Sequence, residues 1–250
     1  MPTGLLYAAI DAIKRRPRLF DAIKRRPRLY RAAKAIKRRF TPPLDDYLRS
    51  CSGVIHVGAH TGQERDTYAG YRLPVIWIEP LPAQFEQLKQ NIKVYPNQIA
   101  IKGLITDRDD VSTILHVSSN DGISSSILDL ALHRDIWPDV HYVDDIAVNS
   151  VRLQTAISRA GLDISNYDAL VMDTLGLELL IMRGLGADIT HFKYIKMEAA
   201  DFESFKGCAT VSEISEFLIS SYGYRLLRKD WFAQRDAGGS YFNLLFGRSQ

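Results

Sequence analysis

Cysteine is scarce in this sequence, since only Cys51 and Cys208 occur among 250 residues. Two cysteines are too few for a disulfide-stabilised scaffold, and their spacing is not that of a metal site. The scarcity argues against a secreted, cysteine-rich protein and leaves a reducing cytoplasm as the expected compartment.

Long hydrophobic runs are also absent. No stretch approaches the roughly 18 apolar residues that a membrane-spanning helix needs. The first apolar stretch, residues 5–13, is interrupted by Asp11 and is followed by positive charge, whereas a secretory signal carries its charge first. We therefore expect neither a membrane span nor a secretory signal. A content of 46% hydrophobic and 24% charged residues is typical of a globular protein with a sizeable core.

Acidic residues are nearly missing from the first 40 positions. Residues 1–40 contain 13 Lys/Arg and two Asp, a net charge of +11, whereas the remainder carries −8. A nucleic-acid channel needs a basic groove in the folded body, and this body is acidic. The charge distribution therefore predicts no specific nucleic-acid partner.

The basic arm contains a tandem repeat, because DAIKRRPRLF at 11–20 returns as DAIKRRPRLY at 21–30. A ten-residue period does not keep one face of an α-helix in register, and Pro17 and Pro27 interrupt a continuous helix. One hypothesis is weak attachment to an anionic membrane or another polyanion, which would place the protein at the inner membrane surface. The other, which we favour slightly, is a solubilising arm that arose by duplication.

After this arm, residues 41–250 are predicted to form one domain in which strands and helices alternate. The expected strands are 53–57, 74–78, 99–105, 169–172, 194–198, 224–227 and 241–246. The expected helices are 63–71, 82–94, 151–160, 177–183 and 212–222. Residues 111–150 break the alternation with strand-like pieces around a serine-rich turn, which indicates an inserted hairpin. Repeated βα units predict an α/β fold with a mostly parallel sheet, helices on both faces, and ligands at the carboxyl ends of the strands.

The first predicted strand ends in a turn, within VIHVGAHTGQE at 54–64, that lacks one expected glycine. Dinucleotide-binding turns read G-x-G-x-x-G, and their second glycine lets the backbone touch a diphosphate. Here His60 stands at that place, which disfavours NAD and favours S-adenosyl-L-methionine, a ligand without phosphate. Glu79 ends the next strand, 21 positions after Gly58, and fits the acid that binds ribose hydroxyls in such folds. The predicted cofactor-binding residues are Gly58, His60, Gly62, Glu64, Glu79, Pro80 and Asp107.

Several segments together resemble one known family. They are VIHVGAHTGQE at 54–64, VIWIEPLPAQFEQLKQNI at 75–92, SSSIL at 124–128, LVMDTLGLELLIMRG at 170–184 and IKMEAADFESFKG at 195–207. This set resembles the FkbM-type methyltransferases, which depend on S-adenosylmethionine, and it spans about Ser52–Phe246. The resemblance implies a Rossmann-like class I methyltransferase fold, with a seven-stranded sheet of order 3-2-1-4-5-7-6 whose last strand is antiparallel. It also implies O-methylation of a hydroxyl on a sugar, glycan or small natural product.

Two residues depart from the pattern of that family. His56 stands where the family often has an aspartate near the amino group of the donor, and Leu175 stands where a polar residue is common. His56 retains the ability to form hydrogen bonds. Leu175 removes a polar contact that an acceptor would otherwise have.

Two carboxylates are the predicted catalytic residues. Asp173 ends the fourth predicted strand and could position or deprotonate the acceptor, an effect worth roughly 10²–10⁴ in rate. The alternative is that Asp173 caps the following helix. Glu198 ends the fifth strand and could line the acceptor pocket, or equally form a salt bridge with a neighbouring lysine. Glu178 is expected to stabilise the start of its helix through the helix dipole.

The insertion supplies the predicted substrate-binding residues. Asn120, Ser124 and Ser125 lie in a turn whose polar groups could hold a hydroxyl-bearing acceptor, although a solvated loop is nearly as good an explanation. His133 and His141 could be acceptor-side bases, but we expect them to be surface histidines. We predict no metal, although Asp173 with Glu198 could hold a divalent ion.

Two further functions remain open from the sequence alone. One is a dinucleotide-dependent oxidoreductase, which the missing glycine opposes. The other is a catalytically silent binding module that keeps the donor fold and is tethered by its basic arm. The sequence does not predict the oligomeric state.

Overall fold

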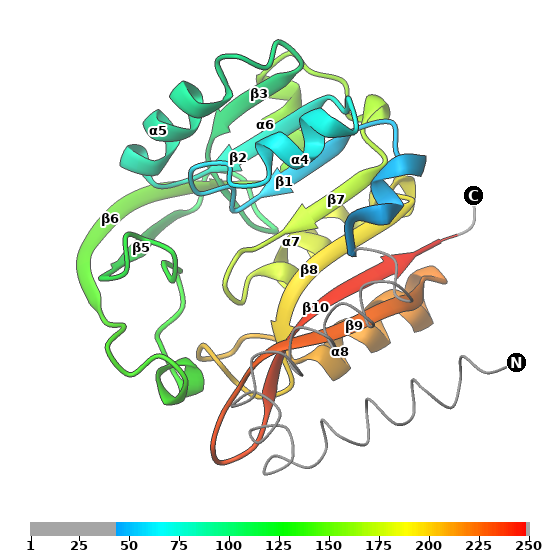
Figure 1. Ribbon diagram of the computed structural model, residues 1–250. Helices are drawn as coiled ribbons and strands as arrows, with labels where there is room; N and C mark the ends of the chain where they lie inside the picture. The colour runs from blue at the N-terminus through cyan, green and yellow to red at the C-terminus, as the bar shows by residue number, and fades with distance from the viewer. Residues whose placement is uncertain (1–43, 249–250) are drawn as a thin grey trace, which may run out of the picture. The chain divides into compact units, whose positions relative to one another are not determined.

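A computed structural model describes residues 44–248, so the basic arm at 1–40 lies outside the described residues. A seven-stranded sheet in the order β3-β2-β1-β7-β8-β10-β9 forms its centre (Figure 1). These strands are β1 (Val54–Val57), β2 (Val75–Glu79), β3 (Gln98–Lys102), β7 (Ala169–Met172), β8 (Tyr194–Ala200), β9 (Arg225–Gln234) and β10 (Ser240–Gly247). When these seven strands are numbered 1 to 7 along the chain, their order in the sheet is 3-2-1-4-5-7-6. Strand β10, the last in the chain, runs antiparallel to both of its neighbours, β8 and β9. The predicted fold is confirmed.

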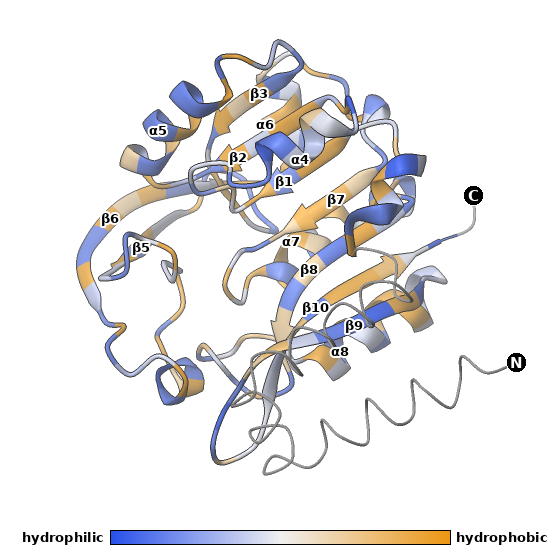
Figure 2. Cartoon of the chain, in the orientation of Figure 1, coloured by the Kyte–Doolittle hydropathy of each residue, from blue (hydrophilic) through white to orange (hydrophobic). Residues whose placement is uncertain are grey.

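The central strands have continuous apolar sequences because both of their faces are covered. All residues of β1, β2 and β7 are buried, as expected of parallel strands between two helical layers. At the edge of the sheet, β9 alternates between exposed and half-buried residues and is rich in charge. Figure 2 shows the contrast, with hydrophobic colour along β7 and hydrophilic colour on β9.

Helices cover both faces of the sheet. The helices described are α4 (Arg65–Gly70), α5 (Pro82–Ile92), α6 (Leu153–Arg159), α7 (Glu178–Leu185) and α8 (Val211–Glu216). Residues of α6, α7 and α8 share one core cluster with Val57, Met172 and Met197. On the opposite face, Tyr68 of α4 packs its ring against His56 and Trp77, 6.0 and 5.3 Å away between ring centres.

Shorter helical pieces complete the described chain. They are η1 (Leu44–Ser50), η2 (Leu132–Asp135), η3 (Ile164–Asn166), η4 (Gly186–His191) and η5 (Phe217–Ser221). The predicted helix at 212–222 is thus divided into α8 and the π-helical turn η5. Within residues 44–248 no helix has the length and apolar character of a membrane span.

The predicted insertion is a small second sheet. It has the order β4-β6-β5, from β4 (Leu104–Ile105), β5 (Ser112–Ser118) and β6 (Tyr142–Val151). Two predicted boundaries were wrong there. The third strand stops at Lys102 and resumes as β4, and the helix expected from Val151 starts at Leu153 because Val151 pairs with Ile105. Pairing between distant segments decided both boundaries.

Candidate active site

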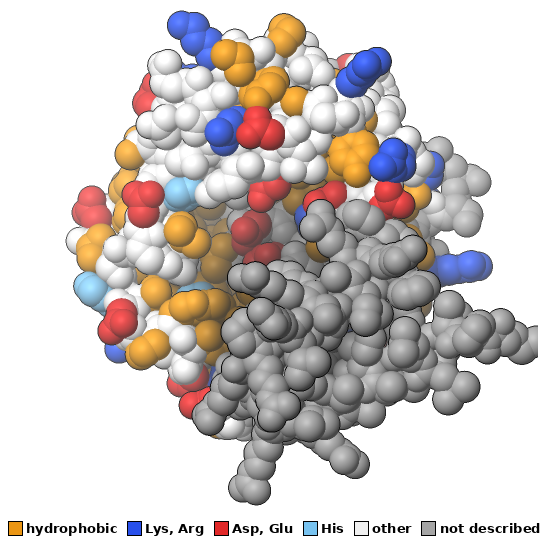
Figure 3. All heavy atoms as spheres, viewed as in Figure 1, with side chains coloured by type: hydrophobic (Ala, Val, Ile, Leu, Met, Phe, Trp, Pro, Cys, Tyr) orange, Lys and Arg blue, Asp and Glu red, His pale blue; other side chains and the backbone are white. Residues whose placement is uncertain are grey.

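A cavity of about 230 Å³ opens at the carboxyl ends of β1, β2 and β7. Its lining comes from the ends of β1 and β2 and the turns after them, from the segment after β7, from β4, from Leu115 of β5, and from the loop 118–126. This is where ligands bind in open α/β sheets. Figure 3 shows acidic side chains in the hollow of this face.

The turn after β1 is built for close approach of the backbone. Gly58 has φ 78°, and a Cβ atom there would lie 1.9 Å from the carbonyl oxygen of Asp173, so only glycine fits. The amides of Gly58 and Ala59 both donate to the carbonyl of Ile78, at 3.0 and 3.1 Å. The turn is therefore held between the ends of β7 and β2.

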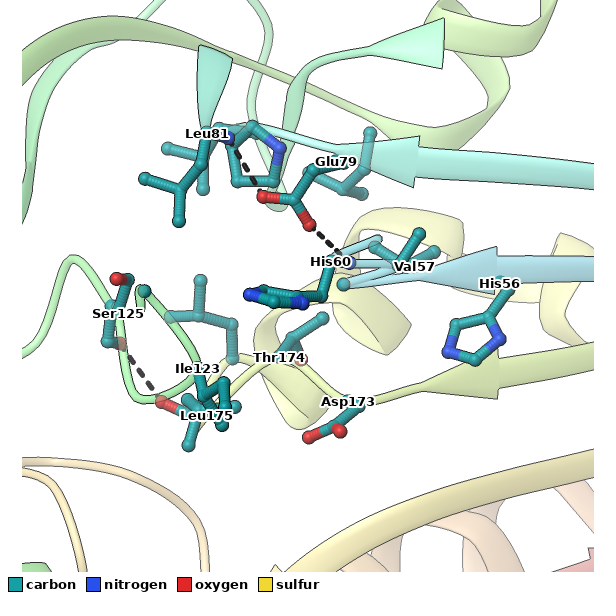
Figure 4. Close-up of a pocket in the computed structure, with 18 of the residues that line it drawn as sticks. His56, Val57, His60, Glu79, Leu81, Ile123, Ser125, Asp173, Thr174 and Leu175 are labelled. Atoms are coloured by element: carbon teal, nitrogen blue, oxygen red, sulfur yellow. Dashed lines mark hydrogen bonds between the residues drawn. The ribbon is translucent and has the colours of Figure 1, made fainter. Parts of the chain in front are cut away.

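Glu79 is tied directly to this turn. Its Oε2 accepts a hydrogen bond from the His60 amide at 2.7 Å, and its Oε1 accepts one from the Leu81 amide at 2.9 Å (Figure 4). Burial raises the pKa of Glu79, and these two backbone donors oppose the rise. Each carboxylate oxygen keeps capacity for another donor, such as a sugar hydroxyl. The structure thus brings the glycine turn and the predicted ribose-binding acid into one cavity.

The predicted site residues divide into two groups. Seven line the cavity, namely Gly58, His60, Glu64, Glu79, Pro80, Ser125 and Asp173. Five do not, namely Gly62, Asp107, Asn120, Ser124 and Glu198.

Two of the predicted donor residues outside the lining pack against helices. Gly62 has φ 73° and allows Leu88 of α5 to approach, since a Cβ atom at Gly62 would lie 2.7 Å from Leu88 Cδ1. The backbone of Asp107 lies against α7, where a Cβ atom on Gly184 would be 2.7 Å from its Cα. Both positions shape the surroundings of the cavity, and a direct donor contact by either stays a prediction.

Asn120 and Ser124 use their polar atoms within their own loop. Asn120 Nδ2 donates to Ser124 Oγ at 3.0 Å, and Asn120 Oδ1 accepts from the hydroxyl of Ser118 at 2.6 Å. Ser124 is buried and also meets His133 Nε2 at 3.1 Å. Of the three predicted acceptor-binding residues, only Ser125 lies in the cavity wall.

Asp173 and Glu198 lie side by side. Asp173 directly follows β7 and Glu198 lies in β8, each one residue after the cross-strand pair Met172 and Met197. Together they line a second pocket of about 20 Å³, which shares Asp173 and Leu175 with the larger cavity. A pocket of that size holds little more than one water-sized group.

The electrostatics of this pair favour proton uptake. Desolvation in the recess and the neighbouring carboxylates, Glu198 first among them, raise the pKa of Asp173 well above its ordinary value. Desolvation also raises the pKa of Glu198 to about 7, although Lys196 and a hydrogen bond from Asn243 oppose the shift. Near neutral pH this pair can therefore take up a proton, as a general base must.

The alternative role of Asp173 as a helix cap is not what the structure shows. The position before α7 is Leu177, and no side chain caps that helix. The buried Glu178 instead accepts hydrogen bonds from Thr174 N at 3.0 Å, Thr174 Oγ1 at 2.9 Å and Gly176 N at 3.1 Å. Glu178 thus holds the loop that carries Asp173, the structural kind of role expected for it.

Of His56, His133 and His141, only His133 differs from its sequence-based description. His56 is buried, contacts the Tyr68 hydroxyl through Nδ1 at 3.1 Å, and stacks on Trp77. Its burial lowers its pKa to about 4, so it is neutral at physiological pH. The expectation of a surface position for His133 was wrong, because it is 3% exposed, whereas His141 is exposed as expected.

Sequence reasoning missed the apolar walls of the cavity. Leu81, Ile105 and Leu115 are buried residues that also line it. Leu115 could have been found, because it is the inward position of an alternating strand in 112–118. Ile105 could not, since its place depends on the pairing of β4 with β6.

Among residues 44–248, no three His, Cys, Asp or Glu side chains are grouped so as to hold a metal ion. The absence of a metal requirement stays a prediction.

Comparison with known proteins gives a family match. The family model described as the methyltransferase FkbM domain matches residues 56–226, more than half of the chain. No curated protein matches the chain in sequence.

Solved structures with similar folds are distant in sequence. The StiE O-MT structure is 13% identical, with 89% of this chain and 76% of that chain covered and a TM-score of 0.46. The methyltransferase domain of bacterial CtHen1-C is 11% identical, with 80% and 91% covered and a TM-score of 0.44. TrmK from M. capricolum, solved with S-adenosyl-homocysteine, is 9% identical, with 79% and 62% covered and a TM-score of 0.44.

Proposed function

The chain belongs to the FkbM methyltransferase family, and from that premise we propose that it transfers the methyl group of S-adenosylmethionine to a hydroxyl of a sugar, glycan or small natural product. Dependence on S-adenosylmethionine follows from the family, and it rejects the dinucleotide-dependent oxidoreductase. The hydroxyl acceptor and its chemical class are our proposal.

The residues of the cavity fit this donor. The Glu79 carboxylate, held by two amides, has capacity left for ribose hydroxyls, and Gly58 lines the same cavity. Leu81, Ile105 and Leu115 offer apolar surface for a flat base. Glu64, on the same cavity, supplies a carboxylate for the amino group of the donor.

When bound, the donor supplies an electrophilic methyl group on a sulfonium. The chain must therefore align an acceptor and remove its proton. Alignment can lower a barrier by roughly 7–11 kcal/mol in favourable cases. Asp173, which lines both the donor cavity and the smaller pocket, is the proposed base, and Glu198 is the carboxylate beside it that helps hold the proton.

Local charge favours particular acceptors. Asp173 is surrounded by the carboxylates of Glu64, Glu178 and Glu198, with Lys196 as the opposing charge. A phosphate or carboxylate next to the reacting hydroxyl would be repelled there. We therefore propose an acceptor that is neutral or cationic beside its hydroxyl.

The observation that carries the proposal is the short contact between Glu79 and the His60 amide, which holds the carboxylate proposed to bind ribose at the glycine turn. The test is incubation of the protein with isotopically labelled S-adenosylmethionine and with carbohydrate or lipid-linked fractions of the host, followed by mass spectrometry. A labelled methyl ether supports the proposal. Binding of donor without methyl transfer to any fraction would instead support a catalytically silent binding module.

The arm at 1–40 is a separate question, since no described residue belongs to it. On sequence alone we propose no more than weak contact with an anionic surface. Co-sedimentation with vesicles of phosphatidylserine, compared with vesicles of phosphatidylcholine, tests that contact.

A further inference from the structure

The loop 118–126 forms one wall of the donor cavity. Gly122, Ile123, Ser125 and Ser126 all contribute to the lining. In Figure 4, Ile123 and Ser125 lie on the side of the cavity opposite Asp173, and the His60 ring extends toward them. A ligand in this cavity would therefore contact the loop.

The loop is a preformed unit. Ser118 O accepts from Gly122 N at 3.2 Å, and Ser118 Oγ accepts from Ser124 N at 2.9 Å. At its end, Ser126 Oγ donates to the carbonyl of Leu175 at 2.9 Å, which ties it to the segment after β7. These bonds fix the shape of the loop and leave the carbonyl of Asp121 at its tip for contacts with other elements.

Two side chains from different elements meet at the tip. Gln84 Nε2, from α5, donates to the carbonyl of Asp121 at 2.9 Å. His60 Nε2, from the glycine turn, lies 2.9 Å from the same oxygen. Since a carbonyl oxygen can only accept, His60 carries a proton on Nε2, and its Nδ1 accepts from Gln63 at 3.0 Å.

The backbone conformation at Asp121 and Gly122, the tip of the loop, brings it into contact with the start of α5. Asp121 and Gly122 have φ values of 61° and 81°, which make a tight left-handed turn. A Cβ atom on Gly122 would lie 2.6 Å from Leu81 Cδ1 and 3.2 Å from Gln84 Nε2. The packing of Gly122 against Leu81 is an apolar contact that adds to the hydrogen bonds, and it lies at the start of the same helix.

We propose that Gln84 is a positioning residue that, together with His60, holds the tip of loop 118–126 closed over bound S-adenosylmethionine. Gln84 does not line the cavity, so it acts only through the Asp121 carbonyl. The proposal rests on the donor site proposed above. It assigns the donor affinity and the rate of product release in part to a side chain outside that site.

The test compares Gln84→Met with Gln87→Met. Methionine matches glutamine in length and charge but lacks the N–H donor. Gln87 is an exposed residue of the same helix that donates to Asn91 at 2.9 Å and contacts neither loop nor cavity, so its variant is the matched control. Gln84→Lys restores an N–H donor and is the rescue variant.

Loss of one neutral hydrogen bond corresponds to roughly a 3- to 10-fold change in an equilibrium constant. We expect Gln84→Met to raise the Kd of S-adenosylhomocysteine and the KM of the donor by that factor, with the KM of the acceptor unchanged. Gln87→Met should match the natural sequence, and Gln84→Lys should recover most of the loss. Calorimetry and steady-state kinetics give these values.

Amide hydrogen exchange of residues 119–123 in the unliganded protein tests, without any ligand, whether Gln84 holds the tip of the loop. Faster exchange there in Gln84→Met than in Gln87→Met supports the proposal, and equal exchange overturns it. Failure of the natural sequence to bind S-adenosylhomocysteine would overturn the proposed function instead. Equal Kd values for Gln84→Met and Gln87→Met would overturn the role of Gln84 in donor affinity.

Discussion

Two carboxylates at the ends of the strands on either side of β1 have different surroundings. Glu79 lies at the end of β2, and each of its carboxylate oxygens accepts a hydrogen bond from a backbone amide. Asp173, just after β7, faces other carboxylates, which help to raise its pKa. Two amide donors orient the Glu79 carboxylate for ligand binding and oppose the rise of its pKa on burial, whereas the like charges around Asp173 add to the rise of its pKa. We therefore predict that the Glu79 side of this edge (the donor half) binds the donor and that the Asp173 side (the acceptor half) binds the acceptor.

Asp173→Asn gives the sharpest test of this division. An amide of the same shape cannot accept the proton of the acceptor, so we expect turnover to fall by roughly 10²–10⁴. Donor affinity should stay near that of the natural protein, because the donor half is untouched. Single-turnover kinetics and calorimetry with S-adenosylhomocysteine measure the two effects. An equal loss of turnover and of donor affinity would contradict the division of the site into a donor half and an acceptor half.

Glu79→Ala should give the opposite pattern. It removes the ribose contact and leaves the amides of His60 and Leu81 without their acceptor, so we expect donor affinity to fall by about 10- to 100-fold. Glu86→Ala is the control, since Glu86 is an exposed residue of α5 that forms an ion pair with Lys89. Unchanged affinity by calorimetry would reject the assignment of Glu79.

The pH dependence of kcat/KM tests the acceptor half, which contains Asp173 and Glu198. A base must be deprotonated, so kcat/KM should rise about tenfold per pH unit at low pH and level off above the pKa of the pair, for which Glu198 indicates about 7. Glu198→Gln removes a negative neighbour that raises the pKa of Asp173, so the midpoint should move to lower pH. A midpoint that stays in place would show that the two groups are not coupled.

Deletion of residues 1–40 should have the smallest effect. The predicted site residues all lie between positions 58 and 198, so turnover of a soluble acceptor should change less than about twofold, well under 0.5 kcal/mol. Circular dichroism checks that the shortened protein is folded. A folded but inactive protein would show that the arm is part of the site.

Much of the fold was accessible from local patterns. Buried parallel strands such as VIWIE at Val75–Glu79 are short apolar runs, and the strand order followed from the family resemblance. The glycine turn was accessible too, because Gly58 and Glu79 have recognisable spacing. Boundaries in the insertion were not, since Val151 looks like the start of a helix until β4 is present to pair with it.

The candidate site was accessible in part for the same reason. Glu79 and Asp173 end strands of one parallel sheet, so their meeting at one edge follows from topology. Asn120 and Ser124 looked equally suited to a ligand, yet the loop itself uses their polar groups. His133 shows the same limit, because the contacts of its ring with Ser124 and Tyr241 join segments far apart in the sequence.

The sequence by itself determined the glycine turn and the acids that end the strands, because these depend on residue type and short spacing, whereas the strand order was implied by the resemblance to a known family. Tertiary structure alone decided which carboxylates share a pocket, how far the pKa of each is shifted, and that Gln84 meets His60 at the Asp121 carbonyl. Those properties depend on distances between residues far apart in the chain, and such distances exist only after the chain has folded.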